Sequence, residues 1–365
     1  MGPTRRAMLA ACAGAVPALA ASPFGEDRPS SPLGLVIHSV PIRGAADRGR
    51  RPEDRIGDPV RFLDHARSLG VRSIQVGIGA RDDAYADALR SRAEAAAISL
   101  EGIASLPRDE TDLGRFEAEI RTARRAGATI VRTVMLSGRR YETFDSAASF
   151  RQFADRAFAS LALARPIVAR HDVRLAVENH KDWRSDELTA ILRRLGSDHV
   201  GVCLDTGNSM ALLEDPMETV EALAPLALTT HFKDMGVEEY AKGFLLAEVP
   251  LGAGVLDLPR VVRTLRAARP EIRFNLEMIT RDPLEVPCLG DRYWATFSDL
   301  PARHLARSLA HVRAHPPKAP LPRIARLAPE ERLRAEDDNI RRCLAYAKEG
   351  LFADGSDARP HHRSE

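Results

Sequence analysis

Short apolar runs alternate with amphipathic helical patterns from residue 33 to about residue 280. There are eight such runs, at residues 33–38, 72–78, 98–104, 129–135, 173–178, 200–205, 227–232 and 272–277. Most neighbouring runs are separated by the length of one strand and one helix, which is the repeat of a βα unit. The pattern therefore predicts eight strands that alternate with helices.

The helical segments between the runs carry their own signals. In residues 185–195, leucine and isoleucine side chains recur at i, i+3, i+4 and i+7, which is the spacing of one helical face. Ser185 is expected to cap the start of this helix, and Gly196 is placed to end it. This segment is accordingly predicted to be the helix between the fifth and sixth strands.

Eight βα units in about 250 residues match the size and repeat of a (β/α)8 TIM barrel. A doubly wound open sheet would usually carry a glycine-rich phosphate turn, and neither GxGxxG nor GxxxxGKS follows the first run. We therefore predict an α/β fold, a TIM barrel over residues 33–300. Residues 301–365 are predicted to form a C-terminal helical extension with a frayed tail, used for packing or oligomer contact.

The first 21 residues are predicted to be a signal peptide. Adjacent Arg5 and Arg6 precede a weakly apolar segment that ends in small residues at Ala20. This arrangement is typical of twin-arginine signals, which export folded proteins in bacteria, so a periplasmic or otherwise exported location is expected. An ordinary secretory signal and a lipoprotein signal that uses Cys12 are the alternatives.

Composition and charge exclude several classes of protein. Of 365 residues, 44% are hydrophobic and 28% are charged, which fits a globular enzyme and not a disordered chain. No apolar run reaches the roughly 20 residues that span a bilayer, so stable membrane insertion is not expected. The formal charge of +2 includes two arginines of the predicted signal peptide. The remaining chain is balanced, and nucleic acid is not an expected partner.

The four cysteines do not form a recognisable framework. Cys12 belongs to the predicted signal peptide, and no CxxC pair is present. A cysteine zinc site or a set of disulfides is therefore not expected. Cys203 is interpreted as a small core residue, while a bridge between Cys288 and Cys343 stays open.

Acidic residues and a histidine occur at the ends of the last four apolar runs. They are Glu178, Asp205, His231 and Glu277. In a TIM barrel the carboxyl ends of the strands meet at the active-site face. Three carboxylates and one imidazole would repel one another there unless a cation lay between them. This donor set suits Mn²⁺, Mg²⁺ or Co²⁺, and also Zn²⁺, so we predict one divalent metal site.

With these residues in view, the chain resembles the xylose isomerase-like TIM barrels. That family includes sugar isomerases, ketose 3-epimerases, inosose dehydratases and apurinic endonucleases. The resemblance covers about residues 33–300 and rests on the motifs ENH, LDTGN, HFKD and LGAGVLD. In epimerase-like members, the last four strands supply Glu, Asp, His and Glu as metal ligands. Those positions correspond here to Glu178, Asp205, His231 and Glu277.

The resemblance implies a metal-dependent isomerase or epimerase that acts on a keto-sugar or related polyol. One divalent ion, with Mn²⁺ the first expectation, would stabilise an enediolate. Glu178 and Glu277 would act as acid and base on opposite sides of the substrate while also binding the metal. Family members are often dimers or tetramers, so a homo-oligomer is expected.

Further residues near the strand ends are candidates for substrate contact: His38, Arg140, His180, Lys181, Asn208, Lys233 and Trp294. His180 and Lys181 would bind sugar hydroxyls above Glu178, or would form a solvated loop pair. Asn208 would donate to a hydroxyl, or would cap a helix. Each of these residues therefore has a structural interpretation beside the functional one.

The remaining candidates carry similar alternatives. Lys233 would touch substrate or pair with its neighbour Asp234. His38 would reach the site or be a core histidine. Arg140 would bind an acidic group of the substrate or be a solvated charge. Trp294 would form a wall against the sugar, or pack in the core of the extension.

Three other functions share these residues. A lyase or dehydratase would use the same proton abstraction to expel a group from a keto-sugar, keto-glycoside or inosose. A nuclease of this fold would need three zinc ions, a basic groove and a histidine where Asn208 stands. A barrel that only binds sugar would keep the site without turnover.

Overall fold

The barrel predicted from the sequence is present. The computed structural model describes residues 31–352, so the predicted signal peptide and the predicted frayed tail lie outside the described residues. Eight parallel strands close into a barrel in the order β1-β10-β7-β6-β5-β4-β3-β2. They are β1 (Gly34–Val36), β2 (Ser73–Val76), β3 (Ser99–Ile103), β4 (Ile130–Thr133), β5 (Arg174–Glu178), β6 (Val200–Asp205), β7 (Ala227–Phe232) and β10 (Phe274–Leu276).

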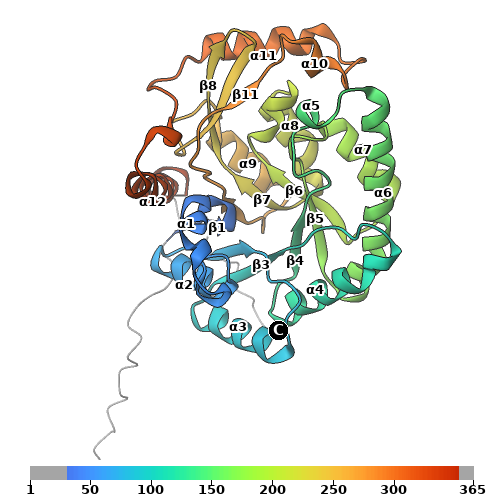
Figure 1. Cartoon of the computed structure of the whole chain (residues 1–365), viewed down its shortest axis with the longest axis vertical. Coiled ribbons are helices and arrows are strands. Elements are labelled where there is room, and N and C mark those ends of the chain that lie inside the picture. The colour runs from blue at the N-terminus through green and yellow to red at the C-terminus, as the bar shows by residue number, and fades with distance from the viewer. Residues whose placement is uncertain (1–30, 353–365) are drawn as a thin grey trace, which may run out of the picture.

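Helices cover the outside of the barrel, which confirms the α/β class (Figure 1). They are α2 (Pro59–Ser68), α3 (Asp83–Ala95), α4 (Leu113–Arg125), α6 (Ala147–Arg170), α7 (Ser185–Leu195), α8 (Pro216–Leu223) and α9 (Leu258–Ala268). Two short helices, α1 (Pro41–Ala46) and α5 (Arg140–Thr143), lie in the loops after β1 and β4. α7 ends at Gly196 in the left-handed conformation, as predicted. The cap prediction was wrong: Ser185 is the first helical residue, and its hydroxyl donates to Glu214 instead.

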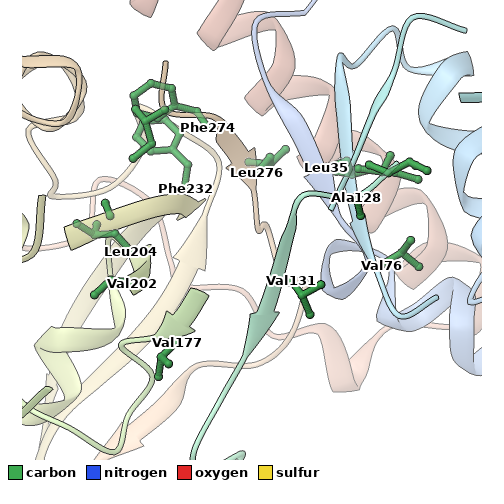
Figure 2. Packing of buried hydrophobic residues seen from close by; sticks show 14 of the residues in the cluster. Leu35, Val76, Ala128, Val131, Val177, Val202, Leu204, Phe232, Phe274 and Leu276 are labelled. Atoms are coloured by element: carbon green, nitrogen blue, oxygen red, sulfur yellow. The ribbon is translucent and has the colours of Figure 1, made fainter. Parts of the chain in front are cut away.

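Successive side chains of the barrel strands alternate between the apolar layer under the helices and the interior of the barrel. Apolar side chains such as Val177, Leu204 and Leu276 pack in the large core cluster between the strands and the helices. Figure 2 shows members of this cluster on neighbouring strands. The residues that follow these three are Glu178, Asp205 and Glu277. Because successive side chains of a strand point to opposite faces, these acids face the barrel interior.

The barrel closes where its first and last strands meet. β1 pairs in parallel with β10, Gly34 opposite Asn275. Beyond the strand ends, the Ser39 hydroxyl donates to the carbonyl of Leu276 at 3.0 Å. The same oxygen accepts from the backbone N–H of Met278 at 3.1 Å. Ser39 therefore ties the two ends of the barrel together on either side of Glu277.

A second sheet was not predicted from the sequence. β8 (Asp234–Tyr240), β9 (Gly243–Val249) and β11 (Leu284–Val286) form an antiparallel sheet in the order β11-β9-β8. Two of its strands fall between β7 and β10, in the longest interval between predicted strands. The available signal for this hairpin was two short segments with β-forming residues, MGVEEY and GFLLAEV, on either side of a possible turn at Ala241 and Lys242.

The described part of the C-terminal extension contains two α-helices. α11 (Ala302–Ala314) packs near β8 and β9 at the top of Figure 1, close to α10 (Asp291–Trp294). α12 (Pro329–Tyr346) lies against α1, where its buried Glu336 accepts from the backbone of Ile42 and Arg43. Among residues 31–352, no helix has the length and apolar character to cross a membrane. Cys288 and Cys343 are buried as free thiols in separate apolar clusters, so the disulfide that the sequence left open is not formed.

Asp234 fastens the loop that follows the second sheet. Its two carboxylate oxygens accept from the backbone N–H groups of Met235, Gly252, Gly254 and Leu256 at 2.8 to 3.1 Å. A Cβ on Gly254 would lie 2.2 Å from Asp234 Oδ1, so only glycine allows this approach. The motifs HFKD and LGAGVLD are therefore one hydrogen-bonded unit.

We expect Asp234→Ala to lower the free energy of unfolding by roughly 3 kcal/mol, because it leaves four N–H groups without their acceptor. The matched control is Asp257→Ala, which removes only the exposed N-cap of α9 and should cost about 1 kcal/mol. Urea unfolding of both variants measures the difference. Equal losses would contradict the role assigned to Asp234.

Candidate metal centre

Four consecutive barrel strands bring the predicted ligands together. Glu178, Asp205 and His231 lie on β5, β6 and β7, and Glu277 directly follows β10. Parallel pairing sets Asp205 opposite His231 in register. One ligand atom from each of the four residues lies within 4.8 Å of the others, and all four are buried. The barrel therefore assembles a compact donor set of three carboxylates and one imidazole, which could bind a divalent metal.

Two atoms of this cluster support the fit to a cation. Asp205 Oδ2 and His231 Nδ1 are buried without a well-aligned hydrogen bond among the described residues, although the ammonium group of Lys233 lies 2.7 Å from Oδ2. Nδ1 instead faces Glu178 Oε2 at 3.3 Å and Glu277 Oε1 at 3.2 Å. Asp205 Oδ1 is held by the backbone N–H groups of Gly207 and Asn208, which fixes the carboxylate. Buried lone pairs of this kind are costly unless a ligand takes them up.

A chain of hydrogen bonds below the cluster orients His231. Its Nε2 lies 2.6 Å from Gln75 Oε1, and Gln75 Nε2 donates to Glu101 at 3.1 Å. Glu101 also accepts from Thr229 and Asn275, so its carboxylate requires the amide nitrogen of Gln75 to face it. The amide oxygen then faces His231 and accepts from its Nε2–H group, so Nδ1 is the ring nitrogen that faces the carboxylates and would bind a metal.

Glu178 is held from both sides by neighbouring side chains. Arg132 on β4 donates through Nε and Nη2 to Oε2, the first at 2.7 Å. Asn208 Nδ2 donates to Oε1 at 3.0 Å. Burial opposes ionisation of Glu178, but Arg132 and then His231 outweigh it and keep the pKa of Glu178 well below its usual range. Glu178 is therefore ionised and fixed in place.

Glu277 has one neighbour in the interior and one near solvent. Lys233 contacts both Glu277 Oε2 and Asp205, whose Oδ2 lies 2.7 Å from Nζ. His38 Nδ1 lies 3.0 Å from Oε1, and its side chain is 38% exposed. His231 and Lys233 outweigh the effect of burial and keep the pKa of Glu277 well below its usual range. Glu277 is thus the carboxylate of the cluster with a direct link to the surface.

A sequence profile of the xylose isomerase-like TIM barrel matches residues 63–311. The chain belongs to the xylose isomerase-like TIM-barrel family. Members of this family are enzymes, and the four-residue cluster lies where the motifs of the sequence placed it. The family assignment confirms the expectation of an enzyme at this coarse level.

Three known proteins are similar to the chain, with sequence identities between 15% and 27%. The 3-oxo-isoapionate decarboxylase of Pectobacterium atrosepticum is 27% identical over 226 residues, which cover 59% of this chain and 77% of the relative. A xylose isomerase-like protein of Mycobacterium smegmatis, solved in complex with magnesium, superposes with a TM-score of 0.53 at 20% identity over 76% of this chain and 98% of its own. D-psicose 3-epimerase superposes with a TM-score of 0.53 at 15% identity over 81% and 94% of the two chains. At these identities the two structures support the fold alone.

Lys181 and Asn208, on the loops after β5 and β6, are buried, so the solvated-loop interpretation of Lys181 was wrong. Lys181 Nζ donates to Asn208 Oδ1. Asn208 does not cap a helix; its side chain links Lys181 to Glu178. His180 is half-buried, and burial, followed by the charge of Lys181, lowers its pKa to about 3. Contact of these residues with substrate stays a prediction.

Lys233 and Asp234 are not partners, which corrects that alternative. Lys233 binds the carboxylates of the cluster, while Asp234 accepts from the backbone N–H groups of its own loop. His38 contacts Glu277, which favours the alternative in which it reaches the site, and its contact with substrate stays a prediction. These positions place Lys233 and His38 on either side of Glu277.

Arg140 and Trp294 are held by contacts away from the cluster. The Arg140 guanidinium pairs with Glu187, donates to Thr296 and lies over the ring of Phe297. Trp294 Nε1 donates to a backbone carbonyl, and its ring packs beside Tyr293. Their contact with substrate stays a prediction, and the observed contacts favour structural roles for both.

Sequence reasoning missed the residues that orient the ligands. Gln75 and Glu101 lie on β2 and β3, and Arg132 lies on β4. A polar residue in the middle of an apolar strand was the available signal, because a buried polar group needs a partner.

We expect the purified protein to bind about one divalent ion per chain. His231→Ala removes the only nitrogen donor of the cluster and should abolish stoichiometric binding. The matched control His315→Ala changes an exposed histidine of the extension and should leave the metal content unchanged. Elemental analysis of protein prepared without chelator measures both. Equal metal content in the two variants would rule out this site.

We also expect Gln75→Leu to weaken metal affinity by roughly 10- to 100-fold, because His231 loses the acceptor that fixes its proton on Nε2. The matched control is Gln152→Leu, a change at an exposed position of α6. Competition with a metal-sensitive dye gives both affinities. Unchanged affinity in Gln75→Leu would show that the hydrogen-bond chain does not orient the ligand.

Proposed function

We propose that the protein is a divalent-metal-dependent enzyme that removes the proton next to the ketone of a keto-sugar or related polyol and returns it, as an isomerase or epimerase does. The observation that carries this proposal is the convergence of Glu178, Asp205, His231 and Glu277 within 4.8 Å. A divalent cation held by these residues would stabilise the negative charge that develops on the substrate oxygens. Mn²⁺ and Mg²⁺ are the first ions to test.

The surroundings of the two glutamates assign them different roles. Glu277 is the better-placed base, because His38 contacts it and is partly exposed, so a proton taken up by Glu277 can pass to solvent. Glu178 is held by Arg132 on one oxygen and by Asn208 on the other. An epimerase would need Glu178 to return a proton to the opposite face of the substrate, and Arg132 would have to yield for that step.

The hydrogen bonds that Arg132 and Asn208 donate to Glu178 restrain this carboxylate. They favour a second candidate function, a lyase, because a lyase can work with a single acid/base group. In elimination, Glu277 takes the proton, the C–H electron pair forms a C=C bond, and the β-substituent leaves with its bonding pair and takes up that proton from Glu277. In decarboxylation of a 3-keto acid, the C–C bond to the carboxylate breaks, its electron pair moves toward the ketone, and carbon dioxide leaves. The carbon then takes a proton that reaches it from solvent through His38 and Glu277. The decarboxylase relative supports this candidate.

Two expectations about context stay proposals. We propose export by the signal predicted in residues 1–21, which would bring the enzyme to sugars outside the cytoplasm. We also propose a homo-oligomer. Neither bears on the chemistry of the four-residue cluster.

We expect the metal-loaded protein to exchange the hydrogen next to the ketone for deuterium when ketoses and keto-sugar acids are incubated in D₂O. Glu277→Gln should slow the exchange by at least about 100-fold, since it removes the base. The matched control Glu239→Gln changes an exposed glutamate of β8 and should exchange at the parental rate. Proton NMR measures both.

The products separate the two candidate functions. A deuterated stereoisomer or isomer identifies an isomerase or epimerase, and loss of a substituent or of carbon dioxide identifies a lyase. Metal-loaded protein that neither exchanges deuterium nor forms product with any member of the panel would refute both.

A further inference from the structure

Lys181 is a buried cation beside the cluster. It is 3% exposed, and its ammonium group donates to the amide oxygen of Asn208. Within residues 31–352, no ion pair joins it to a carboxylate. The other cations around the cluster each contact a carboxylate: Arg132 with Glu178, Lys233 with Asp205 and Glu277, and Arg281 with Glu248. Lys181 is therefore the exception in this group.

A buried ammonium group without a counter-ion is unfavourable, because the interior solvates it poorly. Burial, followed by repulsion from Lys233, lowers the pKa of Lys181 to about 8. Glu248 and Asp205 favour the charged form, but both already pair with other cations. The protein by itself leaves the charge of Lys181 incompletely compensated.

The balance of charge becomes more positive when a metal is bound. The buried carboxylates Glu178, Asp205, Glu248 and Glu277 pair with Arg132, Lys233 or Arg281, whereas Lys181 has no such pair. A divalent ion would add two positive charges on the side of Lys181 where the cluster lies. This local surplus of positive charge is one that an anionic ligand would offset.

The place of Lys181 connects this surplus to the reacting groups. A single amide, that of Asn208, separates its ammonium group from Glu178. The adjacent His180 has a buried Nδ1 without a hydrogen-bond partner in the described part of the chain. The ammonium group of Lys181, which has no ion pair with a carboxylate, and the imidazole of His180, which has an unpaired nitrogen, thus lie on one loop beside the cluster.

We propose that the substrate carries a carboxylate that pairs with Lys181, so that the enzyme acts on a keto-sugar acid and not on a neutral ketose. This inference rests on the proposed function, since it names the substrate class of the same site. Lys181 is its specificity-determining residue. Either an isomerase or a lyase outcome is compatible with such a substrate.

Two matched pairs of ligands test the proposal. 2-Keto-D-gluconate and D-fructose differ only in a carboxylate or a hydroxymethyl group beside the ketone. 5-Keto-D-gluconate and L-sorbose differ in the same two groups at the end of the chain far from the ketone, so the two pairs test two positions of the carboxylate. Isothermal titration calorimetry with the full chain in Mg²⁺ measures their affinities without requiring turnover. We expect at least one acid to bind about tenfold or more tightly than its ketose partner.

Variants assign the preference to Lys181. Lys181→Met should bring the affinity ratio of acid to ketose near one, with the ketose affinity kept. The matched control Lys242→Met changes an exposed lysine in the turn between β8 and β9 and should keep the parental ratio. Thermal unfolding and metal content show whether Lys181→Met is folded. Lys181→Arg, which retains the charge, should keep the preference for the acid. If the methionine variant does not fold, the affinity ratio of acid to ketose is measured in Lys181→Arg instead.

The outcomes separate this proposal from the proposed function. The proposal is overturned if neither acid binds more tightly than its ketose partner, including the case in which neither acid binds, or if Lys181→Met keeps the preference. Deuterium exchange on neutral ketoses without any preference for acids would overturn the proposal alone. A Lys181-dependent preference for acids without deuterium exchange or product would support the carboxylate subsite and refute the proposed reaction.

Discussion

The burial of three carboxylates inside a closed barrel is the constraint on which the rest of the structure depends. A carboxylate removed from water is stable only when hydrogen bonds or cations compensate it. Arg132 and Asn208 do this for Glu178, backbone N–H groups do it for Asp205, and Lys233 bridges Asp205 and Glu277. The polar interior is thus a connected network, and a change in one member alters the others.

This network explains which features the sequence could reveal. The eight strands and the four ligands were predictable, because apolar runs mark buried strands and an acid at the end of such a run is unusual. The alternation of side chains then dictates that Glu178, Asp205 and Glu277 face inward. At these positions, the apolar run followed by an acid in the sequence corresponds to a buried strand whose last carboxylate faces the barrel interior.

Other features depend on contacts between distant segments and left little local trace. Gln75 orients His231 across 156 residues, and the partner of Lys233 turned out to be Glu277 and not the adjacent Asp234. The pairing of Arg132 with Glu178 likewise requires closure of neighbouring strands. The second sheet was missed for another reason, since a short hairpin between two barrel strands resembles an extended loop.

The closure of the barrel at β1 and β10 has a mechanical consequence. Glu277 stands at this joint, between the two hydrogen bonds that Ser39 makes across it, while the other ligands belong to strands on one side. An ion that binds all four residues would link β5, β6, β7 and β10 to one another, and β10 is joined in turn to the segment after β1 through Ser39 and His38. Separating β10 from β7 would strain or break the bond between the ion and Glu277. The ion should thus slow the opening of the barrel as well as serve the reaction.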